Sequence, residues 1–600
     1  MIRKFLELLS PAERRGLYAL FTVHLGVAFI EMLGIASILP FMAVVANPDI
    51  IQTNQWLKLV YDYFALTSQK SFLFFLGALV LGMLVFTNLF KALSVWMTLD
   101  YDNRLNYELG RRLLASYLAR PYEFFLNKNT AELGKNIIAE TRVVIAGVLS
   151  PSMQAITSAI LSFFILALLV VVNPLVALAI FLVLGGSYVS IYWLVQRRLK
   201  NLGQEQFDAN TLKYKFSAEA LAGVKDLKIL GRELVFLEKY SLHARRHARH
   251  NAVAGIISQL PRYALEIIAF GGILLIVLFA LKSEQAASGI VPLLALYAFA
   301  GYRLLPALQQ VFASISTVRF SLPSLDTIHR DVVEARRTTS PEIILAKTHL
   351  LPALPFAQGF EIRSVVYCYP GTTEPTINGM SLTIAPNASI GFVGSTGSGK
   401  TTIVDIILGL LTPTSGQLLV DGIEISGDNI ARWQRNLGYV PQHIYLSDDT
   451  IARNIAFGVP DHEIDMEAVI RAAKIANLHK FIERELPERF ETVIGERGVR
   501  LSGGQRQRIG IARALYRDPS VLIMDEATSA LDGITEDAVM DALKTLSTKK
   551  TVIMVAHRLT TVKDCDAIYL MDHGRIVNHG TYDELIDSSS WFKGVAGFGT

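Results

Sequence analysis

Cysteine and charge are both scarce in this sequence of 600 residues. The two cysteines, Cys368 and Cys565, form no spacing motif, so we expect free thiols in a reducing compartment rather than a disulfide framework. Charged residues make up only 18% of the chain, and the formal net charge is +4. A charge so small for this length gives no indication of a nucleic-acid partner.

Hydrophobic residues are abundant instead, and they are unevenly spread. They make up 51% of the chain, and the mean hydropathy is +0.37, values typical of a membrane protein. Long apolar runs are confined to residues 17–310, whereas residues 358–600 have the composition of a soluble domain. The sequence therefore predicts a membrane domain at 1–340 and a soluble domain at 341–600.

Six apolar segments are long enough to cross a bilayer, which takes about 20 residues in a helix. They lie near 17–45, 72–98, 143–172, 174–194, 252–281 and 289–313. The loops after the second and fourth segments are rich in Arg and Lys, and the connections on the other side carry almost none. Because basic loops stay on the cytosolic side, we expect a multi-pass protein with both termini and the soluble domain in the cytosol.

The two basic loops are also permissive for helix. Helices that continue from the membrane would extend tens of ångströms into the cytosol at about 1.5 Å per residue. The stretches near 120–128 and 217–229 read as short helices at the tips of these helical hairpins.

The soluble domain contains GSTGSGKT at 394–401, the pattern of a phosphate-binding loop. A strand-like run, ASIGFV, precedes it and a helix-like run follows, which is the context that the motif requires. Its backbone N–H groups and the helix N-terminus attract phosphate oxygens, Lys400 reaches the β- and γ-phosphates, and the Thr401 hydroxyl is a ligand for Mg²⁺. The predicted nucleotide contacts here are Gly394, Ser395, Thr396, Gly397, Ser398, Gly399, Lys400, Thr401 and Thr402.

Acidic residues end a second buried strand, VLIMDE at 521–526. Asp525 is placed to hold Mg²⁺, as in other phosphate-loop enzymes. Glu526 follows at the strand end, where a carboxylate can orient and deprotonate the attacking water. His557 ends the strand-like TVIMVAH and would reach the same edge of the sheet.

LSGGQ at 501–505 is the signature of the ATP-binding cassette (ABC) family, and the whole soluble half resembles its nucleotide-binding domain. The other motifs also occur in the order found in that domain: Tyr369, the phosphate loop, YVPQ ending at Gln442, GERG, MDEATSALD and His557. The resemblance implies that Tyr369 stacks on adenine and that Gln442 touches Mg²⁺ and senses the nucleotide. It implies catalytic roles for Glu526 as base and His557 as γ-phosphate switch, and it places Asp532 in the loop joining the two sites. It also implies that Ser502, Gly503, Gly504 and Gln505 contact ATP held by the opposite subunit.

Six spans followed by one cassette resemble the half-transporter layout of ABC exporters. The implied fold is a six-span α-helical transmembrane domain of the type I (type IV) exporter fold, joined to a phosphate-loop α/β nucleotide-binding domain. The short helices near 120–128 and 217–229 would be its coupling helices. The implied activity is ATP hydrolysis with Mg²⁺ coupled to transport by a homodimer. An alternative function of a different class is that of a regulatory or channel protein gated by ATP. The presence of Glu526 and His557 argues against this alternative.

Three cations occur inside predicted spans: Lys91, Arg262 and Arg303. A charge facing lipid costs at least about 2.5–3.5 kcal/mol at the bilayer centre, so these side chains are expected to face the interior. They could form a basic ring that binds an anionic substrate, with Arg suited to phosphate. Alternatively, they could pair with acidic residues: Glu266 lies four residues after Arg262, and Glu31 lies inside the first span. The sequence leaves both interpretations open.

GYRLLPA, LPRYALE and ILPF in the membrane half are similar to the bacterial lipid-linked oligosaccharide flippase of protein N-glycosylation. This patchy resemblance implies outward flipping of an anionic, polyprenyl-pyrophosphate-linked oligosaccharide across the bacterial inner membrane. The alternative is an exporter of other lipids or drugs, of the lipid A or multidrug type.

Overall fold

The computed structural model describes residues 1–46, 48–64, 68–172, 174, 178, 182, 185–281, 287–336, 351–527, 533–547, 549–556 and 558–597. Their contacts divide the chain into two compact units. The first consists of Met1–Arg120 with Asn127–Leu345, and the second of Pro121–Leu126 with Ala346–Thr600. The main division between the two units falls between Leu345 and Ala346.

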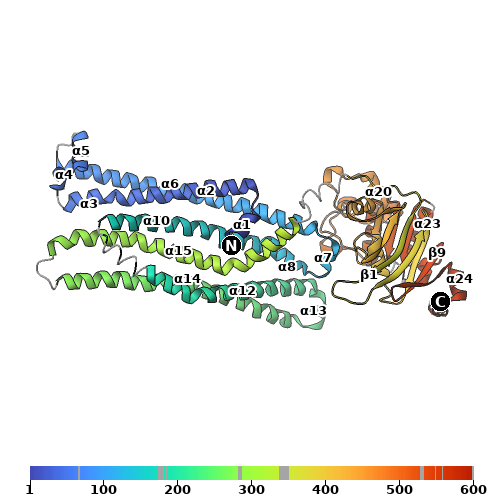
Figure 1. Ribbon diagram of the computed structural model, residues 1–600. Helices are drawn as coiled ribbons and strands as arrows, with labels where there is room; N and C mark the ends of the chain where they lie inside the picture. Colours follow the sequence, from blue (N-terminus) through green and yellow to red (C-terminus); the bar gives the residue numbers. More distant parts are fainter. Residues whose placement is uncertain are drawn as a thin grey trace. The chain divides into compact units, whose positions relative to one another are not determined.

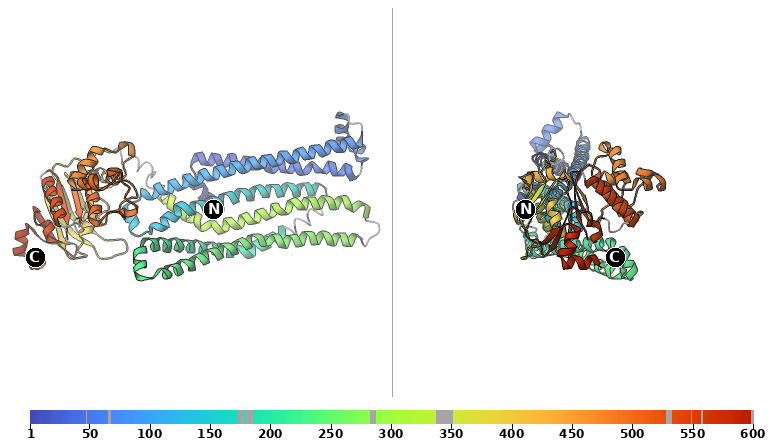
Figure 2. Two further views of the ribbon diagram at one scale, coloured as in Figure 1. Left: turned by 180° about the vertical axis from the view of Figure 1, so that it is seen from behind. Right: turned by 90° about the vertical axis from the view of Figure 1, so that its right-hand side faces the viewer.

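The first unit is a bundle of long helices that run side by side (Figure 1; Figure 2). Helix α6 alone has 50 residues, which is about 75 Å at 1.5 Å per residue and far more than the roughly 30 Å hydrocarbon core of a bilayer. The longest helices therefore extend well beyond a membrane: they are α6 (Gln69–Leu118), α12 (Gly186–Ala222), α14 (Glu233–Leu281) and α15 (Ala287–Arg336). The unit also contains α1 (Ile2–Leu8), α2 (Pro11–Ala36), α3 (Ile38–Ala46) and α10 (Ser150–Val172).

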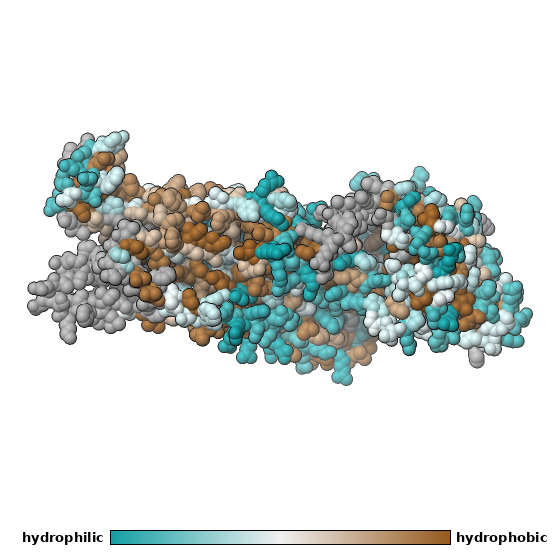
Figure 3. Space-filling model, in the orientation of Figure 1, coloured by the Kyte–Doolittle hydropathy of each residue, from teal (hydrophilic) through white to brown (hydrophobic). Residues whose placement is uncertain are grey.

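The surface of this unit separates into an apolar and a polar part. Figure 3 shows hydrophobic residues gathered over the part labelled α2, α6 and α10 in Figure 1, and hydrophilic residues over the helix ends near α8, α12 and α13. On α6, Phe74 is 82% exposed and Leu89 is 66% exposed, a pattern that suits contact with lipid rather than water. The apolar part therefore marks the membrane-facing region of the bundle.

Within the described residues, three helical segments are long and apolar enough to span a membrane: Pro11–Gly34, Gln69–Leu118 and Thr130–Ala167. They coincide with the first three predicted spans. Of the predicted span near 174–194, residues 175–177, 179–181 and 183–184 lie outside the described residues, and its last part forms the start of α12. The predicted spans near 252–281 and 289–313 lie in α14 and α15, where most side chains between 268 and 300 are outside the description.

A buried ion pair holds the helices together beyond the apolar part. The chain passes through α8 (Thr130–Lys135), the π-helical Asn136–Glu140, α9 (Thr141–Val144) and the π-helical Ile145–Leu149 before α10 begins. Lys135 and Glu140 lie 3.3 Å apart with almost no exposure. The Lys135 ammonium also donates to Thr211 and lies over the ring of Phe207, both on α12. These contacts compensate for burial of the charges and fix the register of α8 against α12.

Two short helices interrupt the long ones. Helix α13 (Val224–Leu230) forms the tip of the α12–α14 hairpin, and Gly231, with φ of 63°, ends it in the left-handed conformation that glycine tolerates (Figure 1). Helix α7 (Tyr122–Leu126) groups with the second unit instead. At the other end of the bundle lie α4 (Ile50–Thr53) and α5 (Gln55–Tyr63).

The second unit contains two sheets. The first is antiparallel, in the order β2 (Ile377–Ile384), β1 (Phe360–Tyr367), β4 (Ser415–Val420) and β5 (Ile423–Glu424). The second is parallel apart from its edge strand β10, in the order β10 (Arg575–Gly580), β9 (Ala567–Asp572), β3 (Ser389–Gly394), β8 (Thr551–Val555), β7 (Val521–Asp525) and β6 (Leu437–Val440). Strands β7 and β8 are buried throughout, as expected where helices cover both faces of a parallel sheet.

Two hydrophobic clusters divide the helices of this unit. One cluster joins both sheets to α17 (Lys400–Ile407) and α18 (Ile430–Gln434). The other lies among α19 (Ile451–Ile455), α20 (Met466–Ile475), α21 (His479–Glu485) and α22 (Gly503–Leu515). Helices α23 (Gly533–Ser547), α24 (Tyr582–Ser588) and α25 (Ser590–Gly597) complete the unit. The parallel strands thus deliver their C-terminal ends to one edge, where the predicted site residues gather.

Candidate nucleotide site and membrane cavities

The phosphate loop connects β3 to α17 with a tightly packed backbone. Gly394, Gly397 and Gly399 have φ angles of 153°, 83° and 99°, which favour glycine. A Cβ atom at Gly394 would lie 2.2 Å from the carbonyl oxygen of Met571. The loop therefore depends on glycine for both conformation and space, and its backbone remains accessible to a phosphate group.

Lys400 lies within this loop. Its ammonium donates to the carbonyl oxygens of Gly394 and Ser395, each at 2.9 Å. Burial lowers the pKa of Lys400, and the carboxylates of Glu526 and Asp525 oppose that shift. The buried Ser398 hydroxyl has no hydrogen-bond partner among the described residues. A buried cation and a buried hydroxyl with unused hydrogen-bonding capacity fit a nucleotide phosphate bound in this loop.

Glu526 and Gln442 come together from separate parts of the sequence. The Gln442 side-chain amide donates to a Glu526 carboxylate oxygen at 2.6 Å. Glu526 follows the last residue of β7, and its φ of 51° is unusual for a residue other than glycine. Its backbone N–H donates to Val555 on β8. Strained backbone of this kind is found at functional sites when the surrounding structure enforces it.

A half-buried carboxyl lies in the helix that follows the loop. Asp405 is in α17, and burial together with the nearby charge of Asp525 raises its pKa to about 6. The carboxylates of Asp525 and Glu526 lie near Lys400, and that of Asp405 lies near Asp525. Such a concentration of negative charge favours a bound divalent cation, so the donor set of Thr401, Gln442 and Asp525 fits Mg²⁺.

Tyr369 and the signature residues have defined positions of their own. The Tyr369 hydroxyl lies 3.1 Å from the Thr402 hydroxyl, which places the ring beside α17. Ser502 caps α22, accepting from the Gln505 backbone at 3.2 Å, while the Gln505 side chain accepts from the Ser502 backbone at 2.8 Å. Gly503 and Gly504 form the first turn of α22. His557 and Asp532 lie outside the described residues.

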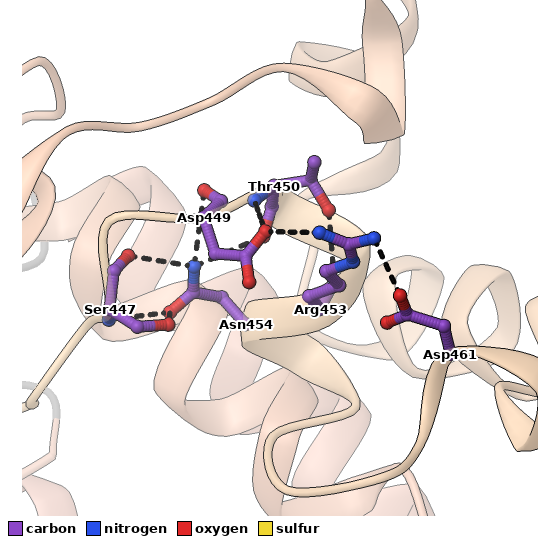
Figure 4. A network of polar contacts seen from close by, with 6 residues as sticks. All are labelled: Ser447, Asp449, Thr450, Arg453, Asn454 and Asp461. Atoms are coloured by element: carbon purple, nitrogen blue, oxygen red, sulfur yellow. Dashed lines mark hydrogen bonds and ion pairs between the residues drawn. The ribbon is translucent and has the colours of Figure 1, made fainter. Parts of the chain in front are cut away.

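A polar network links the loop after Gln442 to the signature helix. Asn454, which is fully buried, binds Ser447 through both backbone and side chain, and Thr450 caps the helix that carries Asn454 (Figure 4). Arg453 pairs with Asp449 and Asp461 on the outer side (Figure 4).

Arg513 on α22 completes this connection. It donates to the backbone oxygens of Asn454 at 2.8 Å and Tyr445 at 2.7 Å. Its burial lowers the pKa of Arg513 to about 10, so the guanidinium stays charged at neutral pH. Arg513 thereby connects the segment that follows Gln442 to α22.

Comparisons with known proteins agree with this arrangement. Residues 19–302 match the ABC transporter transmembrane region, and residues 377–529 match the ABC transporter ATP-binding family. The ATP-dependent lipid A-core flippase of Cupriavidus metallidurans is 30% identical over 535 residues, 86% of each chain. The chain belongs to the ABC transporter family. A protein of Bacillus subtilis named for multidrug export as an ATP-binding/permease protein, YgaD, is 32% identical over 82% of this chain and 83% of its own.

The exporter fold is shown as well. A bacterial Atm1-family ABC exporter with ATP bound has a TM-score of 0.77 at 23% identity, covering 96% of this chain and 98% of that one. The protein is therefore a half-transporter of the exporter type, with one membrane domain and one cassette. Its cassette hydrolyses ATP, and hydrolysis is coupled to transport.

In this ABC transporter the membrane cations are paired wherever their side chains are described. Lys91 on α6 forms an ion pair with the buried Glu31 on α2. Arg262 pairs with Glu266 at 2.9 Å, one turn along α14. The side chain of Arg303 lies outside the described residues. Lys91 and Arg262 thus have the acidic partners that the pairing interpretation names, and their binding of a substrate stays a prediction.

Two cavities of opposite character lie along the same helices of the membrane unit. A polar cavity of about 460 Å³ lies between α2, α6, α10 and α15 and is lined by Glu31, Lys91 and several uncharged polar side chains. An apolar cavity of about 830 Å³ is lined by α1, α2, α10 and α15, and Arg319 is its one charged lining residue. Along α2 the apolar cavity takes residues 17–21 and the polar cavity residues 24–31.

Three residues that make structural contacts in the second unit were not identified from the sequence: Asp405, Arg513 and Glu123. Asp405 and Arg513 stand in helices where nothing in the sequence distinguishes a buried charge from an exposed one. Glu123 on α7 accepts hydrogen bonds from the Thr412 backbone at 3.2 Å and the Tyr367 hydroxyl at 3.4 Å, all within the second unit. An acidic residue inside the aromatic stretch PYEFF was the available signal for Glu123.

Proposed function

We propose that two copies of this chain form a transporter that uses ATP to flip a lipid outward across a bacterial inner membrane. The lipid carries an anionic, sugar-bearing headgroup. In its most specific form, the substrate is a polyprenyl-pyrophosphate-linked oligosaccharide. The cassette faces the cytosol in this proposal, as the basic loops predict.

The pair of unlike cavities carries the proposal of an amphiphilic substrate. A lipid with a large headgroup has one end that needs hydrogen bonds and another that needs apolar surface. The polar cavity offers the first environment and the apolar cavity the second, on adjacent turns of α2 and α15. The polar side chains are confined to one cavity and the second is almost wholly apolar, an arrangement that favours a molecule with a separate head and tail.

The nucleotide residues take the following roles in the proposal. Lys400 and the loop backbone hold the phosphates, Tyr369 stacks on adenine, and Mg²⁺ binds between Thr401, Gln442 and Asp525. Glu526 is the general base, oriented by the hydrogen bond from Gln442, and His557 contacts the γ-phosphate. When bound, Mg²⁺ neutralises charge on the phosphates.

Dimerisation is proposed because each chain has one phosphate loop and one signature. The N-terminus of α22, with Ser502 exposed, is suited to a phosphate held by another copy. Ser502→Arg and Lys400→Ala should each abolish hydrolysis in homodimers. Mixed dimers of the two variants would regain one intact composite site, and their ATPase rate tests the arrangement. No recovery in mixed dimers would contradict it.

An exporter of lipid A-type lipids or of drugs is the second candidate. Relatives named as lipid A-core flippases and as a multidrug exporter support it, since they match most of the chain. The headgroups of lipid A-type lipids and of polyprenyl-pyrophosphate-linked oligosaccharides both contain sugar and phosphate. The drugs of the second candidate have neither group in common with them.

The deciding experiment measures flipping and ATPase stimulation in proteoliposomes. The panel contains polyprenyl pyrophosphate sugars, lipid A-type glycolipids, a phospholipid and a set of cationic drugs. Outward movement of a sugar-bearing lipid, with ATPase stimulated, is the expected result. Stimulation by drugs alone would overturn the proposal. Arg303→Ala, compared with Arg303→Lys, then tests whether that cation binds the anionic headgroup: the lysine should restore flipping only in part.

A further inference from the structure

The polar cavity of the membrane unit has an unusual balance of charge. Among the described side chains that line it are one carboxylate, Glu31, and one ammonium, Lys91, and these two groups form an ion pair. Glu31 retains 9% of its side-chain exposure and Lys91 37%. An incoming phosphate would therefore meet a cation that is already neutralised, with a carboxylate beside it. The cavity is poorly suited to binding a phosphate as its main ligand.

The remaining polar groups of the cavity both donate and accept hydrogen bonds. Gln154 and Gln310 are joined by a 2.7 Å hydrogen bond from one amide to the other, between α10 and α15. Hydroxyls of Ser94, Thr157 and Ser158 line the same space. Amides and hydroxyls can each serve as donor and acceptor, which is the chemistry that also characterises sugar hydroxyls.

An aromatic ring faces these groups from α15. Tyr302 lines the cavity and is 70% exposed. Its ring presents an apolar face and its hydroxyl a polar tip, so it can contact both the C–H face and the hydroxyls of a sugar ring. The volume of about 460 Å³ lies within the range of roughly 300–1,000 Å³ usual for small-molecule sites.

We infer that this cavity is a saccharide subsite, which binds sugar hydroxyls of the headgroup rather than its phosphate. The inference rests on the proposed function only for the statement that the sugar belongs to a transported lipid. Sugar hydroxyls donate to Glu31 and accept from Lys91 while the pair stays intact, and the two glutamine amides and Tyr302 complete the contacts. Specificity follows because a lipid lacking the sugar leaves these polar groups without partners.

Direct binding is tested with two probes that differ in the headgroup. The full chain in nanodiscs is titrated with dodecyl maltoside and with dodecylphosphocholine, below their micellar concentrations. The measured quantity is the ratio of the two dissociation constants. The Gln154→Leu/Gln310→Leu variant keeps side-chain size and removes both amides. Its preference for the maltoside should fall roughly tenfold, the loss expected for one or two hydrogen bonds.

The matched control is Gln259→Leu, an exposed glutamine on α14 that does not line the cavity. It should retain the wild-type preference. Tyr302→Phe provides a second variant at an exposed position, for the case in which the double variant does not fold, and it should reduce the preference severalfold. An unchanged preference in both cavity variants, or an equal loss for both probes, would overturn the saccharide subsite.

Flipping assays separate this inference from the proposed function. If the protein flips a glycolipid but the cavity variants keep their sugar preference, the subsite is wrong and the function stands. If the maltoside preference depends on Gln154 and Gln310 but no glycolipid is flipped, the subsite stands and the function is wrong.

Discussion

The cassette and the membrane unit use buried charge in different ways. In the cassette, Asp525 lies near Asp405, and the carboxylates of Asp525 and Glu526 lie near Lys400. This surplus of negative charge is suited to a metal–nucleotide complex. In the membrane unit, Lys91 and Arg262 each have an acidic partner within the same unit. The charges of Lys91 and Arg262 are thus neutralised within the membrane unit, whereas the cassette is arranged to be neutralised by its ligand.

The difference follows from the solvent around each unit. Water reaches the nucleotide site, and an unbalanced cluster is tolerated there because the ligand supplies the opposite charge. Hydrocarbon supplies no such compensation, so an unpaired charge within a span is expensive. Substitutions that remove one charged group should therefore have opposite consequences in the two units.

The largest expected effect is on chemistry in the cassette. Glu526→Gln keeps the shape and the contact with Gln442 but removes the proposed base, so ATP hydrolysis should fall by a factor of about 10² or more. ATP binding should be preserved, because the substituted carboxylate is not needed for phosphate contacts. Phosphate release and nucleotide binding are measured on the same preparation. Turnover near that of the wild type would show that Glu526 is not the base.

The next effect is on stability of the membrane unit. Lys91→Met leaves Glu31 buried without its ammonium, which should cost about 1–3 kcal/mol of stability, less than for a fully buried pair since Lys91 is partly exposed. Lys91→Met/Glu31→Gln should recover most of this loss.

The stabilities of Lys91→Met and of the double variant are compared by thermal melting of the full chain in nanodiscs. Arg104→Met serves as control, because its pair with Asp100 is exposed and should contribute little. A double variant no more stable than Lys91→Met would argue against the pairing.

Substitution of Asp405 is expected to raise the stability of the cassette rather than lower it. Its folded pKa of about 6 lies above the ordinary value, so the folded state binds a proton more tightly than the unfolded state. Stability from this group is therefore present below about pH 4 and is lost as pH rises to about 6. Asp405→Asn should stabilise the cassette at pH 7 by about 1–2 kcal/mol and flatten this pH dependence.

The pH dependence of the cassette melting transition provides the measurement for Asp405. Asp587→Asn, at an exposed position, is the control and should leave the profile unchanged. A steeper fall in stability of Asp405→Asn between pH 4 and 6 would contradict the assignment.

The smallest effect concerns communication inside the cassette. Arg513→Lys keeps a charge but loses the fork that reaches both Asn454 and Tyr445. We expect ATP hydrolysis to fall only severalfold and ATP affinity to remain, because the residue positions the Gln442 loop and does not touch the nucleotide. Arg453→Lys, on the outer side of the network, should behave as wild type. A large loss of ATP affinity in Arg513→Lys would instead indicate general unfolding.

The sequence alone determined the division into a membrane and a soluble half, since apolar runs and soluble composition separate near residue 340. It also determined the nucleotide motifs, because glycine spacing and strand-ending acids are local features of the chain. Tertiary structure decided which distant groups meet. Gln442 and Glu526 are 84 residues apart and form a hydrogen bond, and Glu31 and Lys91 are 60 apart and form an ion pair. The sequence showed that Lys91 needed either a ligand or a carboxylate, and only the packing of α2 against α6 selected the carboxylate. Pairing of this kind depends on helix register across the bundle, which local periodicity does not specify.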